Sequence, residues 1–136
     1  MFNKAAFFTD IHFGLKSNSQ QHNQDCLDFV NWVVAQAEEH DCETGFFLGD
    51  WHHNRSSLNI TTLNFSIKAL EVLDGYFKNF YFIPGNHDLY YRDRRDVASV
   101  AFADKFPNVK LINNPLTEDG VTLLPWMVND EWKHAK

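Results

Sequence analysis

Short apolar runs, each ended by a polar turn, alternate with longer amphipathic segments along the chain. Residues 4–9 hold the run Ala5 to Phe8, which has no polar alternation, and similar runs occupy 45–48 and 80–83. Continuous apolar runs of this length are typical of parallel strands that are covered on both faces. Further strands are predicted over 109–112 and 121–124, with a turn at Asp119-Gly120 before the last one.

Two longer segments show apolar residues at steps of three and four, which places those residues on one side of a helix. The spacing predicts helices over 25–40 and 59–77, and a weaker pattern predicts one over 94–104. Cys26 lies on the apolar side of the first helix, so we expect it to pack in the core. The polar stretch 16–24 has no periodicity and is predicted to be a loop, with Asn23 in a candidate flexible flap.

The order strand, helix, strand, helix, strand is typical of an α/β fold with a parallel sheet and right-handed crossovers. Ligands bind such sheets beyond the carboxyl ends of the strands. Polar motifs follow each of the first three predicted strands, and the crossovers would bring them together. These motifs are Asp10-Ile11-His12, Gly49-Asp50-Trp51-His52-His53 and Gly85-Asn86-His87-Asp88.

The residue types in these motifs suit a pair of divalent metal ions. Asp10 and His12 are two residues apart, so in an extended segment both side chains point the same way. Their mixture of carboxylate and imidazole suits manganese, iron or zinc better than calcium. Asp50 has two oxygens that can bridge two metals, and Asn86 offers an amide oxygen. Two metals about 3.5–4 Å apart clamp the attacking and leaving oxygens of a phosphoryl group.

The remaining residues of the third motif suit acid catalysis. In this scheme His87 is not a ligand but faces the leaving oxygen, and Asp88 fixes its tautomer. Taken singly, each motif is as compatible with an ordinary polar turn. Taken together, in order and each after an apolar strand, they indicate a catalytic metal site.

Composition limits the partners and the cellular compartment that we expect for this protein. The chain has 136 residues, 44% of them apolar, and a formal net charge of −6, which speaks against a generic basic surface for nucleic acid. Bound metal would neutralise part of that charge. No apolar run approaches the roughly 20 residues of a membrane span, so no membrane partner is expected. Two cysteines, Cys26 and Cys42, make no disulfide framework and are predicted to be reduced thiols in the cytoplasm.

Asp10-x-His12, Gly49-Asp50-x-x-His53 and Gly85-Asn86-His87-Asp88 resemble the first three signature motifs of the calcineurin-like metallophosphoesterases. Other segments, whose sequences are less specific, resemble SbcD-type nucleases and the small subunit of tailed-phage recombination endonucleases. These segments are His12-Phe13-Gly14-Leu15-Lys16, the stretch from Asp50 to Arg55, Asp88-Leu89-Tyr90-Tyr91 and Leu124-Pro125-Trp126.

The resemblance implies a role for each motif residue. Asp10 and His12 would bind the first metal, Asp50 would bridge, and Asn86 would bind the second. The metals would be Mn²⁺, with Mg²⁺, Fe²⁺ or Zn²⁺ as alternatives. The catalytic residues would be His87, its partner Asp88, and His53, which lies beside the site and handles the DNA strand. His52 has no counterpart and is expected to be a loop residue.

The resemblance also implies partners. These are DNA, an SMC-like coiled-coil ATPase subunit and a second copy of the full-length protein as a homodimer, in the bacterial host cytoplasm if the source is a phage. Aromatic and basic residues just after the third motif, and one arginine soon after Asp50, are candidate DNA contacts, although interspersed acids make a solvated face an open alternative. The candidates are Arg55, Tyr90, Tyr91, Arg92, Arg94 and Arg95.

The sequence departs from the family pattern after the third motif. The family completes its site with three more histidines, two of them in a Gly-His-x-His motif, and its fold with a second sheet. The late His134 lacks a preceding strand and is a poor ligand candidate. We therefore expect residues 1–136 to be the N-terminal part of a metallophosphoesterase sandwich whose second half is missing. The resemblance implies a metal-dependent phosphodiester hydrolase acting on DNA, an exo- and endonuclease subunit of a recombination or repair complex in its full-length form. The alternatives are a phosphoprotein or cyclic-nucleotide phosphoesterase, or a truncated, inactive binding or assembly module.

Overall fold

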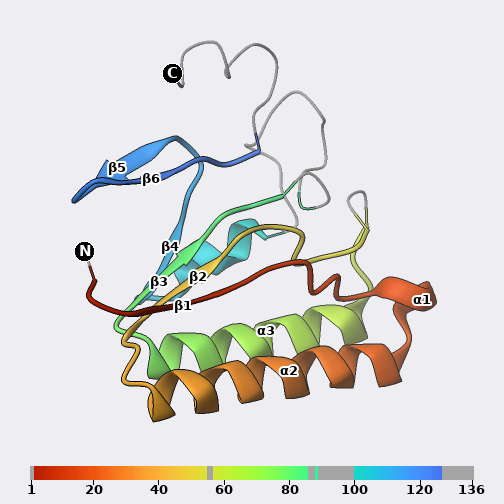
Figure 1. Cartoon of the computed structure of the whole chain (residues 1–136). Coiled ribbons are helices and arrows are strands. Elements are labelled where there is room, and N and C mark those ends of the chain that lie inside the picture. Colours follow the sequence, from red (N-terminus) through yellow and green to blue (C-terminus); the bar gives the residue numbers. More distant parts are fainter. Residues whose placement is uncertain (1, 55–56, 86–87, 89–99, 127–136) are drawn as a thin grey trace.

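A parallel sheet forms the centre of the fold. The computed structural model describes residues 2–54, 57–85, 88 and 100–126. Strands β1 (Ala5–Phe8), β2 (Thr44–Phe47), β3 (Asn79–Phe82) and β4 (Val109–Leu111) pair in the order β1-β2-β3-β4 (Figure 1). All three pairings are parallel, which confirms the predicted strands and the α/β class.

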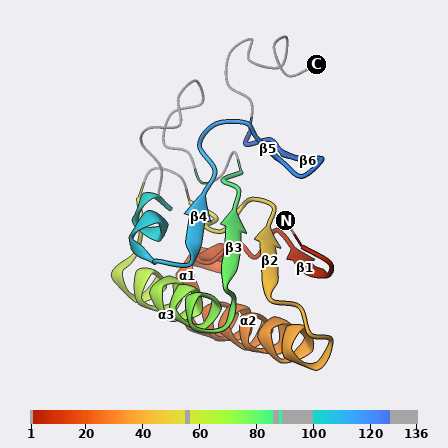
Figure 2. The same cartoon turned by 90° about the vertical axis from the view of Figure 1, so that its left-hand side faces the viewer.

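Two long helices lie on the same face of this sheet (Figure 2). They are α2 (Gln20–Glu39) and α3 (Ile60–Tyr76). A sheet whose strands follow one another in chain order, with right-handed crossovers, places successive crossover helices on one face. The apolar stripes of both helices pack there against β2 and β3, whose core residues include Phe47, Phe80 and Phe82.

Helix α2 begins five residues before the predicted start at 25, so the loop predicted over 16–24 is wrong for residues 20–24. The hydroxyl of Ser19 caps the helix by accepting the His22 N–H at 3.3 Å. Asn23, expected in a flexible flap, is fully buried. Apolar periodicity does not reveal this turn because the residue it buries is polar. Before it, α1 (Leu15–Asn18) is a short turn whose last three residues have φ of 57°, 57° and 61°.

A hairpin packs on the opposite face of the sheet. It consists of β5 (Leu116–Glu118) and β6 (Val121–Leu123), and its apolar side chains contact Phe46 and Tyr81. The predicted turn at Asp119-Gly120 is confirmed. Both turn residues have positive φ, 49° and 81°, as a two-residue hairpin turn requires. Strand β5 was not predicted, because three residues with one apolar side chain give no readable alternation.

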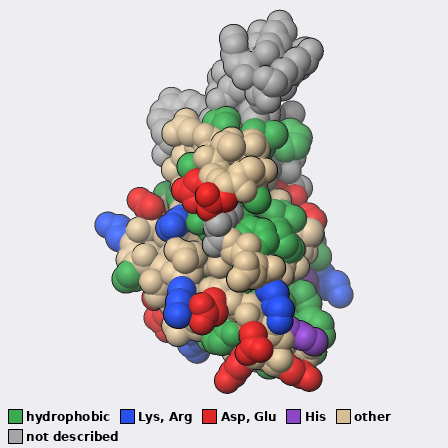
Figure 3. Space-filling model, turned by 60° about the vertical axis from the view of Figure 1, so that its left-hand side comes forward, with side chains coloured by type: hydrophobic (Ala, Val, Ile, Leu, Met, Phe, Trp, Pro, Cys, Tyr) green, Lys and Arg blue, Asp and Glu red, His purple; other side chains and the backbone are tan. Residues whose placement is uncertain are grey.

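Strand β1 is less covered than predicted. Phe7 is 55% exposed, so burial of β1 on both faces is wrong, whereas β2 is buried throughout. Within the described residues β1 is an edge strand, and Phe7 stacks on its neighbour Phe46 at 4.6 Å between ring centroids and meets Phe2 edge-on at 6.2 Å. Figure 3 shows hydrophobic side chains gathered on this side of the molecule.

The helix predicted over 94–104 falls mainly outside the described residues. Its end overlaps a 3₁₀ helix, η2 (Ala101–Lys105), that packs beside β4. Cys26 and Cys42 are buried free thiols, and the predicted core position of Cys26 is confirmed. None of the described helices is long and apolar enough to cross a membrane.

Candidate metal centre

The segments that follow β1 and β2 continue side by side beyond the strands. The Asp10 N–H donates to the Gly49 carbonyl at 3.0 Å, and the Phe13 N–H donates to the Trp51 carbonyl at 2.8 Å. The His53 N–H returns a bond to the Phe13 carbonyl at 2.9 Å. This pairing holds the first two sequence motifs next to each other at the carboxyl end of the sheet.

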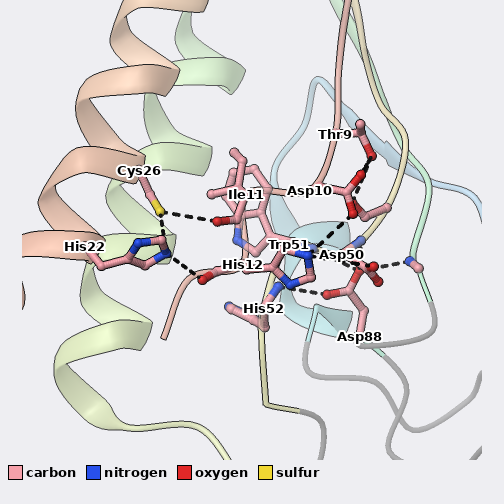
Figure 4. A network of polar contacts seen from close by, with 12 residues as sticks. Thr9, Asp10, Ile11, His12, His22, Cys26, Asp50, Trp51, His52 and Asp88 are labelled. Carbon is pink, nitrogen blue, oxygen red and sulfur yellow. Dashed lines mark hydrogen bonds and ion pairs between the residues drawn. The ribbon is translucent and has the colours of Figure 1, made fainter. Parts of the chain in front are cut away.

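Three predicted ligands converge there (Figure 4). Candidate ligand atoms of Asp10, His12 and Asp50 all lie within 4.8 Å of one another. Nε2 of His12 is 3.4 Å from Oδ1 of Asp10 and 4.0 Å from Oδ2 of Asp50. The Asp10 side chain is 59% exposed, whereas those of His12 and Asp50 are 22% and 18% exposed. The cluster is thus open to solvent from the Asp10 side.

The backbone at these three residues is in the left-handed region. Asp10 and His12 have φ of 56° and Asp50 has φ of 62°. For residues other than glycine this conformation costs on the order of 1 kcal/mol each, and it gathers at functional sites where the surrounding structure enforces it. Left-handed backbone at all three candidate ligands therefore indicates a functional site, and this evidence does not depend on the chemistry of their side chains.

Two glycines let the ends of β2 and β3 touch. A Cβ at Gly85 would overlap Oδ1 of Asp50, and a Cβ at Gly49 would lie 3.0 Å from the Gly85 Cα. Gly49 also has a φ of 117°, which side chains disfavour. The Asp50 carboxylate therefore fills the space that a side chain at position 85 would take. Two carboxylates and an imidazole held this way are a donor set that fits a divalent transition metal.

Asp88 ties the second and third motifs together. Its buried carboxylate accepts N–H bonds at Oδ2 from Asp50 (3.0 Å), Trp51 (3.2 Å) and Gly85 (2.9 Å), and at Oδ1 from His52 (2.9 Å). Burial raises the pKa of Asp88 to about 6; the backbone hydrogen bonds oppose this increase, and the Asp50 charge adds to it. The predicted contact of Asp88 with His87 lies outside the described residues.

Trp51 and His52 turn inward beneath the cluster. Both are fully buried, and Ser66 of α3 joins them: Trp51 Nε1 donates to Ser66 Oγ at 2.6 Å, and His52 Nε2 lies 2.8 Å from the same oxygen. Burial lowers the pKa of His52 to about 3. His52 lies in the segment between β2 and α3, as expected of a loop residue, but its complete burial was not predicted. No apolar periodicity over residues 49–53 signals this burial.

His53 lies beside the cluster, as expected: its ring centroid is 5.5 Å from that of His12, with an edge-on arrangement at 72°. The other predicted site residues fall outside the described part of the chain, so their roles stay predictions. These are Arg55, Asn86, His87, Tyr90, Tyr91, Arg92, Arg94 and Arg95.

Comparison with known proteins agrees with this architecture. The chain is 27% identical over 126 residues to exonuclease subunit 1 of Enterobacteria phage T4, covering 89% of the chain but 37% of the phage protein. The crystal structure of Pseudomonas putida nuclease MPE has the same fold, with a TM-score of 0.53 and 24% identity over 85% of this chain and 50% of the other. The chain thus spans half or less of each relative. Residues 4–132 match the calcineurin-like phosphoesterase family. The chain belongs to the calcineurin-like phosphoesterase family.

Proposed function

We propose that this chain contributes the Asp10–His12–Asp50 ligands to a two-metal site that hydrolyses phosphodiester bonds in DNA. Membership of the calcineurin-like phosphoesterase family supports metal-dependent hydrolysis of a phosphoester. The observation that carries the proposal is the convergence of three ligands on left-handed backbone at the carboxyl end of the parallel sheet. The choice of DNA is supported by the T4 relative, an exonuclease subunit, and by the fold shared with a nuclease.

The two oxygens of Asp50 support its assignment as the bridging ligand. Oδ2 faces His12, at 4.0 Å from its Nε2, whereas Oδ1 lies against Gly85, which precedes Asn86 in the chain. One oxygen therefore faces another candidate ligand, and the other faces the strand end that precedes Asn86, so Asp50 would be shared between two ions. In this proposal Asp10 and His12 hold the first ion, and Asn86 holds the second.

Divalent ions bound here would polarise the phosphoryl group of a phosphodiester. Mn²⁺ is the ion we propose, as the family resemblance implies, and the mixed oxygen and nitrogen donors fit it as they fit iron and zinc. His87 would give a proton to the leaving oxygen, and His53, next to His12, would bind the DNA strand. The ATPase partner and the homodimer stay predictions from the family resemblance.

The test compares three substrates with Mn²⁺: a DNA oligonucleotide, a phosphopeptide and a cyclic nucleotide. We expect DNA to be cleaved, Asp50→Asn to remove cleavage, and Glu71→Gln, an exposed substitution on α3, to leave it unchanged. His87→Ala should abolish cleavage while metal still binds. Preference for the phosphopeptide or cyclic nucleotide would show that the DNA assignment is wrong. Metal binding without hydrolysis of any of the three would favour the binding or assembly module.

A further inference from the structure

The segment 11–14, which carries His12, lies between the 49–53 segment and the inward-facing side of the first two turns of α2. The peptide group between Ile11 and His12 is held on both sides. Its N–H donates to the Asp50 carbonyl at 3.1 Å, and its carbonyl accepts from Cys26 Sγ at 3.4 Å (Figure 4). One contact comes from the end of β2 and the other from α2.

The next two peptide groups repeat this arrangement. Between His12 and Phe13, the N–H donates to the Trp51 carbonyl, and the carbonyl accepts from His22 Nε2 at 3.0 Å and from a backbone N–H of α1 at 3.1 Å. Between Phe13 and Gly14, the carbonyl accepts from the backbone of the 49–53 segment, and the N–H donates to Asn23 Oδ1 at 2.9 Å. Three successive peptide groups are each held by one side chain of α2.

These α2 side chains are themselves fixed. The buried Asn23 donates from Nδ2 to Thr62 Oγ1 of α3 at 2.9 Å, and Thr62 donates to Asn18 at 2.9 Å. A carbonyl only accepts hydrogen bonds, so Nε2 of His22 must carry the hydrogen that it donates to His12. The Cys26 thiol also stays a donor, because burial and the neighbouring Asp25 raise its pKa to about 12.

We propose that His22, Asn23 and Cys26 are positioning residues that fix the backbone of the metal ligand His12 and thereby set the affinity for the first metal. The inference rests on the proposed metal site. His12 has a left-handed φ of 56°, a conformation that persists only where its surroundings enforce it. Groups that orient metal ligands without touching the metal affect affinity by about 10-fold or more when removed.

Calorimetric titration of the whole chain with Mn²⁺, without substrate, tests this. His22→Ala should raise the dissociation constant about 10-fold, because the His12 carbonyl loses its side-chain donor. His22→Gln keeps an N–H donor and should recover most of the affinity. Gln24→Ala is the matched control, since Gln24 also hydrogen-bonds through its side chain on α2, at 2.8 Å to Asp28, but faces solvent.

Thermal unfolding with and without saturating Mn²⁺ separates positioning from general stability. A positioning role predicts that the increase in Tm caused by Mn²⁺ is smaller for His22→Ala than for the wild type. Equal increases, with an unchanged dissociation constant, would overturn the proposal. Absence of Mn²⁺ binding by the wild type would instead refute the metal site, and this inference with it. If His22→Ala does not fold, Cys26→Ala and the donor-retaining Cys26→Ser are compared by the same two criteria.

Discussion

The contact between Gly85 and the Asp50 carboxylate leaves no room for a side chain at position 85. Gly85→Ala should push Asp50 out of place and weaken Mn²⁺ binding about 10-fold, as loss of ligand orientation does elsewhere. Calorimetric titration measures this. Gly75→Ala is the control, because a Cβ there meets nothing within 4 Å and lies in α3, where alanine should stabilise by about 0.5–1 kcal/mol. Unchanged metal affinity in Gly85→Ala would contradict the role given to this contact.

Asp88 holds four backbone N–H groups with one carboxylate. In Asp88→Asn, one oxygen becomes an amide nitrogen that faces a donor, so at least one buried N–H loses its acceptor. We expect the free energy of unfolding in urea to fall by about 1–3 kcal/mol. Glu71→Gln, which neutralises an exposed acid, should change it by less than about 0.5 kcal/mol. A loss no larger than that of the control would mean that the Asp88 network is not important for stability.

The sequence predicted the convergence of the candidate metal ligands better than the residues that pack beneath and around them. Asp10, His12 and Asp50 were foreseen because strand ends in a parallel sheet converge whatever the intervening residues are. The buried positions of His52 and Asn23 were not foreseen. Both are polar residues whose burial depends on hydrogen-bond partners distant in sequence, Ser66 and Thr62. The pattern of apolar positions along the sequence does not show such long-range hydrogen bonds.

At the scale of elements, segments held by apolar packing were predicted well, whereas those held by polar contacts were not. Helix α3 and strands β1 to β4 lie within one or two residues of their predicted bounds, because most of their apolar residues pack in the two core clusters. The first turn of α2 was missed because polar contacts hold it. The exposure of Phe7 was missed because an apolar run does not show whether its strand lies at the edge of the sheet.

His52, buried between the end of β2 and α3, leads us to expect that the free energy of unfolding depends on pH. His52 is buried there with a pKa of about 3, below its value of 6.5 in the unfolded chain. The unfolded state therefore binds a proton that the folded state does not, so stability is full above pH 6.5 and falls as the pH drops toward 3. The slope from His52 alone is at most about 1.4 kcal/mol per pH unit.

Urea unfolding of the wild type and of His52→Asn between pH 7 and pH 4 measures this contribution. Asp88 also titrates in this range with the opposite sign, since its folded pKa is raised, but it is common to both proteins. The stability advantage of the wild type should therefore shrink by roughly 1 kcal/mol for each pH unit below 6.5. A difference that stays constant with pH would show that His52 is not held neutral by burial.

At the scale of the whole molecule, the formal net charge of −6 opposes association with DNA. Two divalent ions add four positive charges and reduce the formal charge from −6 to about −2, with the added charge placed at the substrate site. If the proposed function is right, DNA binding should depend on metal. Fluorescence anisotropy of a labelled single-stranded oligonucleotide should show binding in Mn²⁺ that EDTA abolishes.

Free Mn²⁺ also screens the charge of the DNA phosphates. The effect of Mn²⁺ bound at Asp10 must therefore be separated from the effect of Mn²⁺ in solution. Asp10→Asn makes the chain less acidic, and by charge alone it should bind DNA more tightly. If Asp10 holds the first metal, the variant should instead bind DNA more weakly than the wild type in Mn²⁺, whereas Glu71→Gln, with the same change in net charge, should not. Equal or tighter DNA binding by Asp10→Asn would show that DNA binding depends on the overall charge of the protein and not on metal ions bound at the strand ends.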